Sequence, residues 1–311
     1  MKVVITGGAG FIGSNLAEFW VNENAQVTII DNLRTGYEKN ISGLKEIVFH
    51  KRSITERDFV FDALKGADYV FNLAALVSVP ESVQKPEETR EINIEGLKNL
   101  LDASVKNGVK KLVHSSSAAI YGDDPVMPKV ESMPAKPISP YGETKYGGEL
   151  LCNEYAAKYG LKTASLRYFN VYGPKQNPYG AYTSVIPIFS LRALKNEPLV
   201  VFGDGEQTRD FVFVKDVVSA NVLAAVTENA LGAYNVANGR TITIKELAER
   251  IKQMTGTKSR VVFEPPREGD IKHSSASVDK AKNELNYSGK SSFEEGLKLT
   301  IDYYRKELNT L

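Results

Sequence analysis

The chain has little of the chemistry on which disulfides and metal sites depend. Its single cysteine, Cys152, cannot form an internal disulfide, and we expect a buried, non-catalytic thiol inside a helix, in a reducing compartment. Three histidines and one cysteine show no metal-ligand spacing, so we predict no metal. His50 and His114 fall in strand patterns and are expected to be core residues.

An excess of charge of one sign is also missing, because 39 basic and 38 acidic residues leave a net charge of +1. This balance argues against nucleic acid or an anionic membrane as the main partner. No apolar run reaches membrane-spanning length, and the N-terminus enters a glycine loop without signal-peptide architecture. We therefore expect a cytoplasmic protein. With 311 residues, 42% of them hydrophobic, it can build a large core in two lobes.

The first motif that is present is a strand, a tight loop and a helix at the N-terminus. A β-rich run at 2–6 leads into the loop 7–13 (GGAGFIG), and helical apolar spacing follows from 14 to 20. Glycines in such a loop let backbone N–H groups approach a pyrophosphate at the helix N-terminus. A second strand at 26–30 then ends in an acidic residue, which is the context that dinucleotide binding requires.

That acidic residue, Asp31, favours NAD over NADP. Its carboxylate can accept hydrogen bonds from ribose hydroxyls and would repel a 2′-phosphate. Arg34 is the one nearby feature that opposes this preference, since a guanidinium attracts phosphate.

Strands and helices alternate through the first half of the chain, which predicts an α/β fold with a doubly wound parallel Rossmann sheet. The expected strands are 46–53, 69–75, 110–117 and 162–171, and the expected helices are 87–106 and 141–159. After residue 173, turn formers lead to a helix at 185–195, and the chain returns through a helix at 216–227 and a strand at 233–237.

These patterns divide the chain into two domains. We predict an NAD-binding Rossmann domain at 1–170 plus about 212–238. The remainder, at about 171–211 and 239–311, is predicted to form a smaller mixed α/β C-terminal lobe.

The stretch from Ser115 to Lys145 carries the candidate catalytic groups. Tyr141 and Lys145 are four residues apart, so a helix opened by Pro140 would project both from one face. A free phenol titrates near pH about 10, and a neighbouring ammonium favours the phenolate. Ser117 ends an apolar strand, where its hydroxyl could share the hydrogen bond to a reacting oxygen. The strand expected at 69–75 ends in small residues, where a backbone must pass close to a cofactor.

Taken together, the chain resembles the extended short-chain dehydrogenase/reductase family, specifically the UDP-glucose / UDP-N-acetylglucosamine 4-epimerases. The motifs that carry the resemblance are 6–13 (TGGAGFIG), 31–33 (DNL), 115–117 (SSS), Tyr141-x-x-x-Lys145, 167–174 (RYFNVYGP), 208–212 (TRDFV) and 267–270 (REGD). They span nearly the whole chain.

The resemblance implies a mechanism. Tyr141 would take the proton of the sugar 4-hydroxyl while hydride leaves C4 for the nicotinamide, with Ser117 and Lys145 assisting. The 4-keto sugar would turn over and accept the hydride on its other face, so that C4 inverts without net redox change and NAD stays bound. The family also commonly forms homodimers through the helices at 87–106 and 141–159.

The resemblance also implies that the C-terminal lobe, at about 171–211 and 239–311, is the nucleotide-sugar-binding domain. It further implies two sets of binding residues. The expected NAD contacts are Gly7, Gly10, Phe11, Ile12, Gly13, Asp31, Asn32, Ser53, Ile54, Leu73, Ala74, Ala75, Ser115, Tyr141, Lys145 and Tyr168. The expected UDP-sugar contacts are Ser78, Ser117, Tyr141, Asn170, Arg209, Arg267, Asp270 and Ser274. Tyr121 and Phe169 are expected to line the cofactor pocket or to pack in the core.

Departures from the family pattern indicate the subfamily. Ala118 and Ala119 stand where relatives that dehydrate or decarboxylate the 4-keto sugar carry acidic residues, and a methyl group cannot protonate a leaving hydroxyl. Ser53 and Val77 replace an Asp and a Lys that family members often direct toward the cofactor. Ser274 stands where members limited to non-acetylated sugars have a bulky aromatic residue, so its small side chain leaves room for an acetamido group.

Several functions are therefore compatible with the sequence. The leading one is a UDP-hexose or UDP-N-acetylhexosamine 4-epimerase. The enzyme alternatives are a uronate epimerase, a dehydratase, a decarboxylase or a net oxidoreductase. A non-catalytic cofactor sensor is less favoured because Ser117, Tyr141 and Lys145 are all present.

Overall fold

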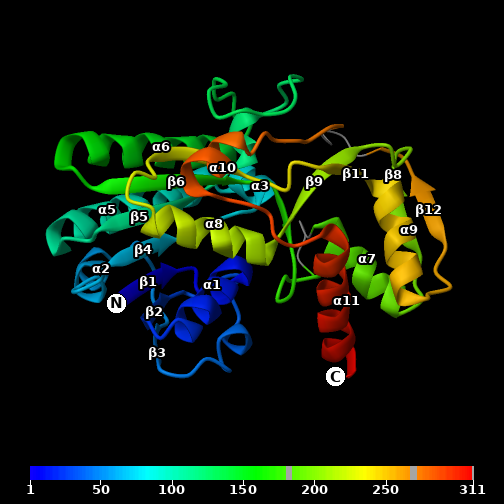
Figure 1. Cartoon of the computed structure of the whole chain (residues 1–311), viewed down its shortest axis with the longest axis horizontal. Helices are drawn as coiled ribbons and strands as arrows, with labels where there is room; N and C mark the ends of the chain where they lie inside the picture. Colours follow the sequence, from blue (N-terminus) through cyan, green and yellow to red (C-terminus); the bar gives the residue numbers. More distant parts are fainter. Residues whose placement is uncertain (180–183, 267–271, 310–311) are drawn as a thin grey trace.

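A seven-stranded parallel sheet forms the centre of the computed structural model, which describes residues 1–179, 184–266 and 272–309. The strand order is β10-β6-β5-β4-β1-β2-β3 (Figure 1). The strands are β1 (Lys2–Thr6), β2 (Gln26–Ile30), β3 (Ile47–His50), β4 (Tyr69–Asn72), β5 (Lys111–Ser117), β6 (Lys162–Tyr168) and β10 (Gly232–Val236). The predicted doubly wound parallel fold is confirmed, whereas the domain boundaries stay a prediction.

Helices cover both faces of this sheet, and the side chains of β1 show why. Val3 and Ile5 pack in the core cluster that α1 and α8 share, whereas Val4 packs in the cluster under α2, α5 and α6. Successive side chains of a strand point to opposite faces, so a continuous apolar run needs a covering layer on each side. These helices are α1 (Phe11–Asn22), α8 (Val214–Val226), α2 (Arg57–Ala63), α5 (Gly96–Asn107) and α6 (Pro140–Tyr159) (Figure 1).

The helix predicted at 87–106 has a more complex form. It begins as α4 (Pro86–Arg90), passes through a π-helical turn, η2 (Glu91–Glu95), and continues as α5. Within that turn Asn93 is buried, accepts a hydrogen bond from Leu76 N–H and donates to Leu76 O and Thr144 Oγ1. Such single π turns occur often at functional sites. The short helix α3 (Val79–Gln84) precedes α4.

The smaller part of the molecule is built on a core of its own. Tyr172, Phe189, Phe211 and Leu247 are among the buried side chains that fill it. One sheet has the order β11-β9-β7 and a second pairs β12 with β8. The elements are β7 (Asn170–Tyr172), α7 (Val185–Leu194), β8 (Leu199–Phe202), β9 (Thr208–Phe213), β11 (Thr241–Thr243), α9 (Ile244–Thr255), β12 (Val261–Glu264) and α11 (Phe293–Asn309) (Figure 1). The short elements η1 (Glu38–Asn40), η3 (Ala118–Tyr121) and α10 (Asp279–Leu285) complete the described chain.

The prediction of a single strand at 162–171 is wrong. β6 ends at Tyr168, and Asn170 begins β7, which pairs with β9 in the smaller sheet. Phe169 lies between them, and its N–H donates to Val236 O at the end of β10. The chain therefore crosses from one sheet to the other at this residue. The strands predicted at 46–53 and 69–75 are also shorter, because pairing in the sheet stops at His50 and Asn72.

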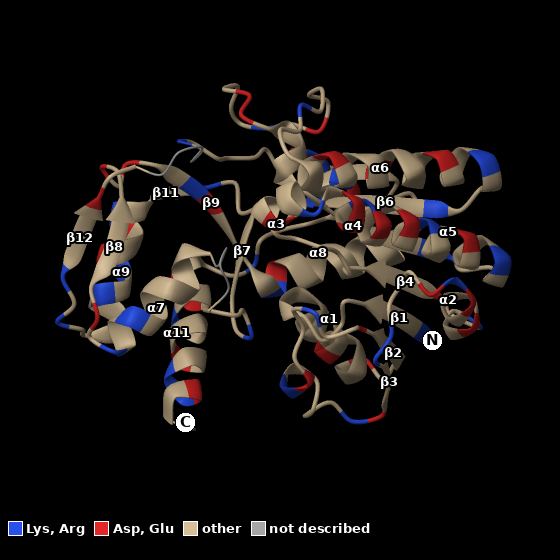
Figure 2. Ribbon diagram, turned by 180° about the vertical axis from the view of Figure 1, so that it is seen from behind, with Lys and Arg blue, Asp and Glu red and all other residues tan. Residues whose placement is uncertain are grey.

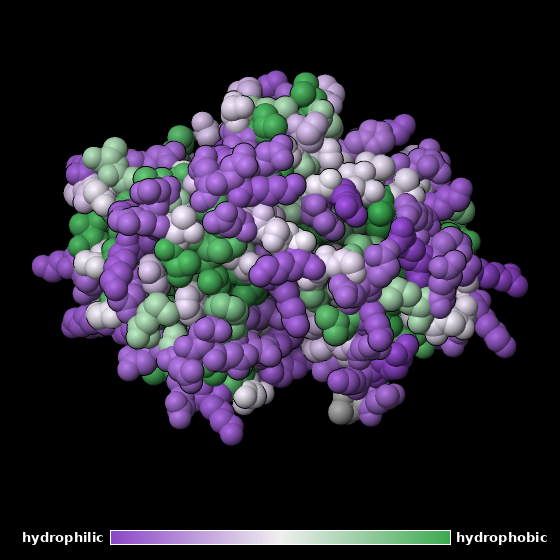
Figure 3. Space-filling view, in the orientation of Figure 1, coloured by the Kyte–Doolittle hydropathy of each residue, from purple (hydrophilic) through white to green (hydrophobic). Residues whose placement is uncertain are grey.

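The surface agrees with the balanced composition. Figure 2 shows Lys and Arg interspersed with Asp and Glu over α5, α6 and α11, without a face of one sign. The face in Figure 3 is mostly hydrophilic, with hydrophobic residues gathered over α8. No helix in the described part of the chain is both long and apolar enough to span a membrane.

Candidate active site

The glycine loop lies against the chain segment that follows β4. Gly7 has a φ of +66°, and a Cβ there would lie 2.7 Å from Ala74 N. A Cβ on Gly13 would lie 2.2 Å from Gly7 O, so only glycine permits this turn into α1. No side chain caps α1 at Gly10. The loop is thus a tight cradle at a helix N-terminus, which fits a pyrophosphate.

Asp31 lies beside this cradle at the carboxyl end of β2. Its Oδ2 accepts a hydrogen bond from Ala9 N (3.0 Å) and its Oδ1 accepts one from Leu33 N (2.8 Å). Burial raises the pKa of the Asp31 carboxyl, and these backbone N–H groups oppose the rise. Asn32 follows on the surface, where its Oδ1 accepts from Arg34 N.

The guanidinium of Arg34, which could attract a 2′-phosphate, is engaged by two acidic side chains. Its guanidinium pairs with Glu81 at 2.6 Å and with Glu88 at 2.5 Å. These acidic partners raise the pKa of Arg34. A guanidinium so engaged is a poor partner for a 2′-phosphate, which supports the NAD preference predicted from Asp31.

The other predicted cofactor residues lie where neighbouring parallel strands end. Leu73, Ala74 and Ala75 follow β4 and are partly buried. Ser53 Oγ is 2.8 Å from Thr55 Oγ1, and Ile54 is buried against Gly96. Carboxyl ends of parallel strands share one edge of a sheet, so the structure brings these residues together with the glycine loop.

The helix α6 places Tyr141 and Lys145 as the four-residue spacing predicts. Pro140 is its first residue, and Lys145 Nζ lies 5.8 Å from the centroid of the Tyr141 ring. Lys145 Nζ donates to Ser115 O at 2.7 Å. Ser117 ends β5, and its hydroxyl lies near enough to the Tyr141 phenol to affect the phenol pKa. The three predicted catalytic residues therefore form one cluster.

A glycine in the first turn of α6 allows this approach. A Cβ on Gly142 would lie 3.0 Å from Ala119 O, so the turn packs directly on the chain that follows Ser117. Ala119 N in turn donates to Ser117 Oγ at 3.1 Å.

Burial is the main influence on the pKa values of Tyr141 and Lys145. Burial lowers the pKa of Lys145 to about 8, so the ammonium remains the main form at neutral pH. Burial raises the pKa of Tyr141, and the nearby Ser117 hydroxyl lowers it in part. Burial therefore sets the direction of the Tyr141 shift, and the prediction that Lys145 lowers the phenol pKa stays a prediction.

Two groups beside the cluster belong to the core. His114 is buried, and its Nδ1 lies 3.2 Å from Asn72 Nδ2. Burial, together with the charge of Lys145, holds the pKa of His114 well below its usual value. Tyr168 is buried as well, and its hydroxyl accepts from Ser115 Oγ and donates to Asn221 Oδ1. The cofactor contact predicted for Tyr168 stays a prediction.

Three predicted substrate residues are brought together by β7, β9 and the segment after residue 271. Asn170 Nδ2 donates to Asp210 O at 3.2 Å. Arg209 is partly buried, and its Nη1 donates to Thr208 O at 2.9 Å. Ser274 N donates to Thr208 O at 3.2 Å, which places Ser274 alongside the start of β9. The substrate contacts predicted for Arg267 and Asp270 lie outside the described residues.

Ser78 has a structural partner. Its Oγ accepts a hydrogen bond from Glu81 N at 3.2 Å and so caps α3. The role predicted for Ser78 in substrate binding stays a prediction.

Cys152 is buried as expected, and burial raises the pKa of its thiol to about 12, which makes it a poor nucleophile.

Sequence reasoning missed a buried ion pair behind the site. Arg167 makes two hydrogen bonds to Glu149, Nε to Oε1 at 2.9 Å and Nη2 to Oε2 at 2.7 Å. Ser116 Oγ donates to the same carboxylate, and Arg167 Nη1 donates to Tyr121 Oη. Tyr121 and Phe169 are both buried in the core cluster. The charge pattern of α6 contains no signal for this pair, since charged residues usually face solvent.

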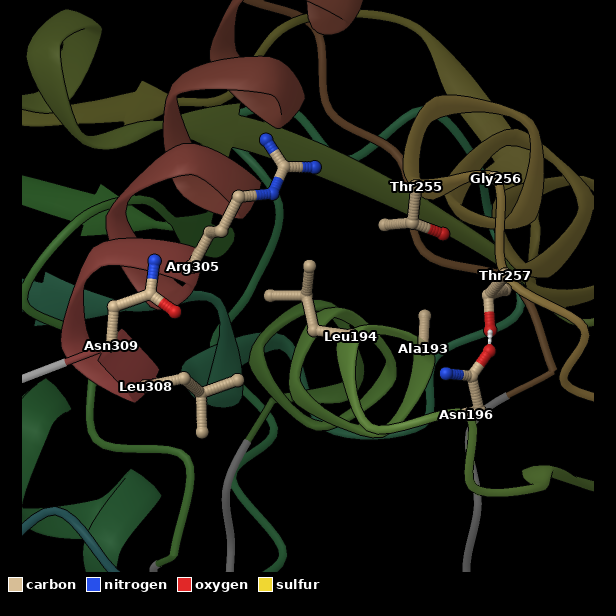
Figure 4. A pocket seen from close by; sticks show the side chains of 9 residues that line it. All are labelled: Ala193, Leu194, Asn196, Thr255, Gly256, Thr257, Arg305, Leu308 and Asn309. Atoms are coloured by element: carbon tan, nitrogen blue, oxygen red, sulfur yellow. Dashed lines mark hydrogen bonds between the residues drawn. The ribbon is translucent and has the colours of Figure 1, made fainter. Parts of the chain in front are cut away.

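A pocket of about 380 Å³ lies elsewhere, among α7, α9 and α11 (Figure 4). Arg305 lines it and pairs with Asp302, while Thr257 donates to Asn196. None of the predicted catalytic or binding residues lines this pocket. The candidate active site is therefore the strand edge described above.

Comparison with known proteins finds relatives that match nearly the whole chain. The family model described as the NAD dependent epimerase/dehydratase family matches residues 3–237. The chain is 36% identical over 310 residues to a putative UDP-glucose 4-epimerase of Methanocaldococcus jannaschii, covering 99% of this chain and 100% of the relative.

Two solved structures are similar over nearly the whole chain. The UDP-glucose 4-epimerase of Thermotoga maritima, with UDP-glucose, is 42% identical with a TM-score of 0.94 and covers 99% of this chain and 100% of its own. The UDP-N-acetylglucosamine 4-epimerase of Methanobrevibacter ruminantium, in complex with UDP-N-acetylmuramic acid, is 39% identical with a TM-score of 0.94 and covers 98% of each chain.

Proposed function

The chain belongs to the NAD-dependent epimerase/dehydratase family, and from this premise we propose that it inverts C4 of a UDP-hexose. The substrates proposed are UDP-GlcNAc/UDP-GalNAc, UDP-Glc/UDP-Gal or both. The observation that carries the proposal is the cluster of Ser117, Tyr141 and Lys145 at the strand edge that also holds the glycine loop.

The residues of the chain fit the cofactor. The cradle of Gly7 to Gly13 would receive the pyrophosphate on the first turn of α1. Asp31 would accept hydrogen bonds from the adenosine ribose hydroxyls. When bound, NAD supplies the reversible hydride acceptor that an inversion through a 4-keto sugar needs.

The chain's own groups would handle the proton. Tyr141 would accept the proton of the sugar 4-hydroxyl, and Ser117 would share the hydrogen bond to that oxygen. Lys145, still protonated at neutral pH, provides a positive charge 5.8 Å from the phenol ring centroid. This charge favours the phenolate that burial alone disfavours.

The nucleotide end of the substrate would lie toward β7 and β9. Arg209 suits a diphosphate because a guanidinium can bind two phosphate oxygens at once, and Asn170 lies on the neighbouring strand. Arg267 and Asp270 are proposed to add contacts to the diphosphate and the ribose.

Two alternatives are less well supported. Ala118 and Ala119 form the first turn after Ser117. Neither methyl group can donate the proton that a dehydratase needs for its leaving hydroxyl, or that a decarboxylase needs at the carbon left after CO₂ departs. A cofactor sensor without chemistry is disfavoured by the intact catalytic cluster. A uronate epimerase uses the same proton and hydride chemistry and stays the main enzyme alternative.

A product assay tests the proposal. Purified protein would be incubated separately with UDP-glucose, UDP-GlcNAc and UDP-glucuronate, without added cofactor, and the products identified by NMR. We expect the 4-epimer of at least one UDP-hexose and no net accumulation of NADH. A pentose or a dehydrated sugar would contradict the reading of Ala118 and Ala119, and conversion of UDP-glucuronate alone would identify a uronate epimerase.

Replacement of Ser274 by tyrosine tests the choice of sugar. We expect S274Y to suppress the use of UDP-GlcNAc by about 10-fold or more and to spare UDP-glucose, because an aromatic ring fills the volume needed by the acetamido group. The measurement is kcat/KM for both substrates. The matched control is Ser275→Tyr at the adjacent partly buried position. Equal losses for both sugars in S274Y would show that Ser274 does not select the substrate.

We further propose a cytoplasmic homodimer that associates through the face formed by α5 and α6. That face exposes Leu150, Tyr159 and Val105, apolar side chains whose burial would favour association. Light scattering coupled to size-exclusion chromatography should give the mass of two chains. A monomer at micromolar concentration would contradict the dimer.

A further inference from the structure

In the first turn of α6, the N–H group of Tyr141 has its hydrogen-bond partner outside the helix and its N-cap. The first four N–H groups of a helix have no intrahelical partner. Pro140 carries no N–H, and Gly142 N donates to the N-cap Ser139 Oγ at 3.2 Å. Between them, Tyr141 N donates to Ser82 Oγ at 3.1 Å. The partner of the Tyr141 amide therefore comes from another element, 59 residues away.

Ser82 is held rigidly in α3. Its side chain is fully buried, and its hydroxyl donates to Val79 O at 2.5 Å. With its proton directed to Val79, the oxygen presents a lone pair to Tyr141 N–H. The cap that Ser78 provides at the start of α3 fixes the same turn.

The residue next to Ser82 ties α3 to the cofactor side of the site. Glu81 pairs with Arg34 at 2.6 Å, and Arg34 lies three residues after Asp31. Neighbouring residues of one short helix thus contact the loop that carries Asp31 and the backbone of Tyr141. α3 connects the two ends of the candidate active site.

We propose that Ser82 is a positioning residue that holds the Tyr141 phenol in register with Ser117 and Lys145. The inference rests on the proposed function, in which Tyr141 accepts the substrate proton. The hydrogen bond between Ser82 and Tyr141 is made to the Tyr141 backbone, so Ser82 acts on the phenol through that backbone. A misplacement of about 1 Å at a reacting group can lower the rate by about 10²-fold. Loss of the Ser82 acceptor loosens the turn that carries the phenol.

Three variants test the role of the hydroxyl. S82A removes it, S82T keeps it, and S104A is the matched control. Ser104 is also fully buried and helical, and its hydroxyl donates only within its own helix, to Leu100 O. We expect S82A to lower kcat by about 10-fold or more with KM changed less than about threefold, since binding groups stay in place. S82T should restore kcat to within about threefold of the parent, and S104A should leave it unchanged.

Site-resolved hydrogen exchange tests the contact without turnover. In the parent protein the Tyr141 amide should exchange slowly although it lies in the first turn of a helix, and S82A should accelerate it whereas S104A should not. Fast exchange of Tyr141 in the parent protein, or equal kcat values for S82A and S104A, would overturn the inference. An inactive parent protein with a protected Tyr141 amide would instead refute the proposed function, and with it the catalytic role assigned to this contact.

Discussion

Replacement of Tyr141 by phenylalanine is expected to lower kcat by about 10² to 10⁴-fold, the usual contribution of a positioned acid–base group. The variant keeps the ring and loses only the hydroxyl, so the packing of α6 on the turn after Ser117 is preserved. Among the described residues of the cluster, Lys145 is already committed to Ser115 O and cannot replace the lost base. We expect UDP-sugar and NAD still to bind.

The measurement is single-turnover kinetics on the preferred sugar, together with substrate affinity by calorimetry. Tyr159→Phe is a suitable control because Tyr159 ends the same helix at an exposed position. An affinity that falls in parallel with the rate would point to altered binding. Turnover near that of the parent protein would refute the assignment of Tyr141 as the base.

Replacement of Arg167 by methionine is expected to lower the free energy of unfolding by about 3 to 5 kcal/mol. Arg167 and Glu149 are 5% and 4% exposed, and the guanidinium satisfies both carboxylate oxygens. Burial opposes the charge of Arg167, but the bonds to Glu149 raise the pKa of Arg167 above its usual value. Without the arginine, Glu149 keeps a buried carboxylate with only Ser116 as a partner among the contacts described.

Denaturant unfolding of the parent and variant measures this loss. The double variant E149M/R167M should recover much of the stability, since a buried pair can be replaced by apolar side chains at little cost. Arg305→Met, which breaks an exposed pair with Asp302, should cost less than about 1 kcal/mol. A loss of that small size in R167M would mean that solvent reaches Glu149.

Local sequence patterns predicted many strands of the large sheet. β1 and β2 begin and end at the predicted residues, because each is a short apolar run bounded by turn formers. The glycine loop and the Tyr141–Lys145 spacing were also readable, since a fixed separation along one chain fixes geometry when the backbone is regular. Pro140 marked the start of α6 for the same reason.

Other features depend on contacts that no local pattern reports. The sequence alone determined the order of strands and helices in the part of the chain that forms the large sheet, the glycine loop and the residues of the candidate catalytic cluster. Only the tertiary structure decided that the chain changes sheets at Phe169. The strand before Phe169, β6, pairs with β10, whereas the strand after it, β7, pairs with β9 in the other sheet. Only burial decided the direction of the Tyr141 and Lys145 pKa shifts, because desolvation depends on the surroundings of a group. The Arg167–Glu149 pair and the contact of Ser82 with Tyr141 likewise join residues that are brought close only when the sheet and its helices assemble.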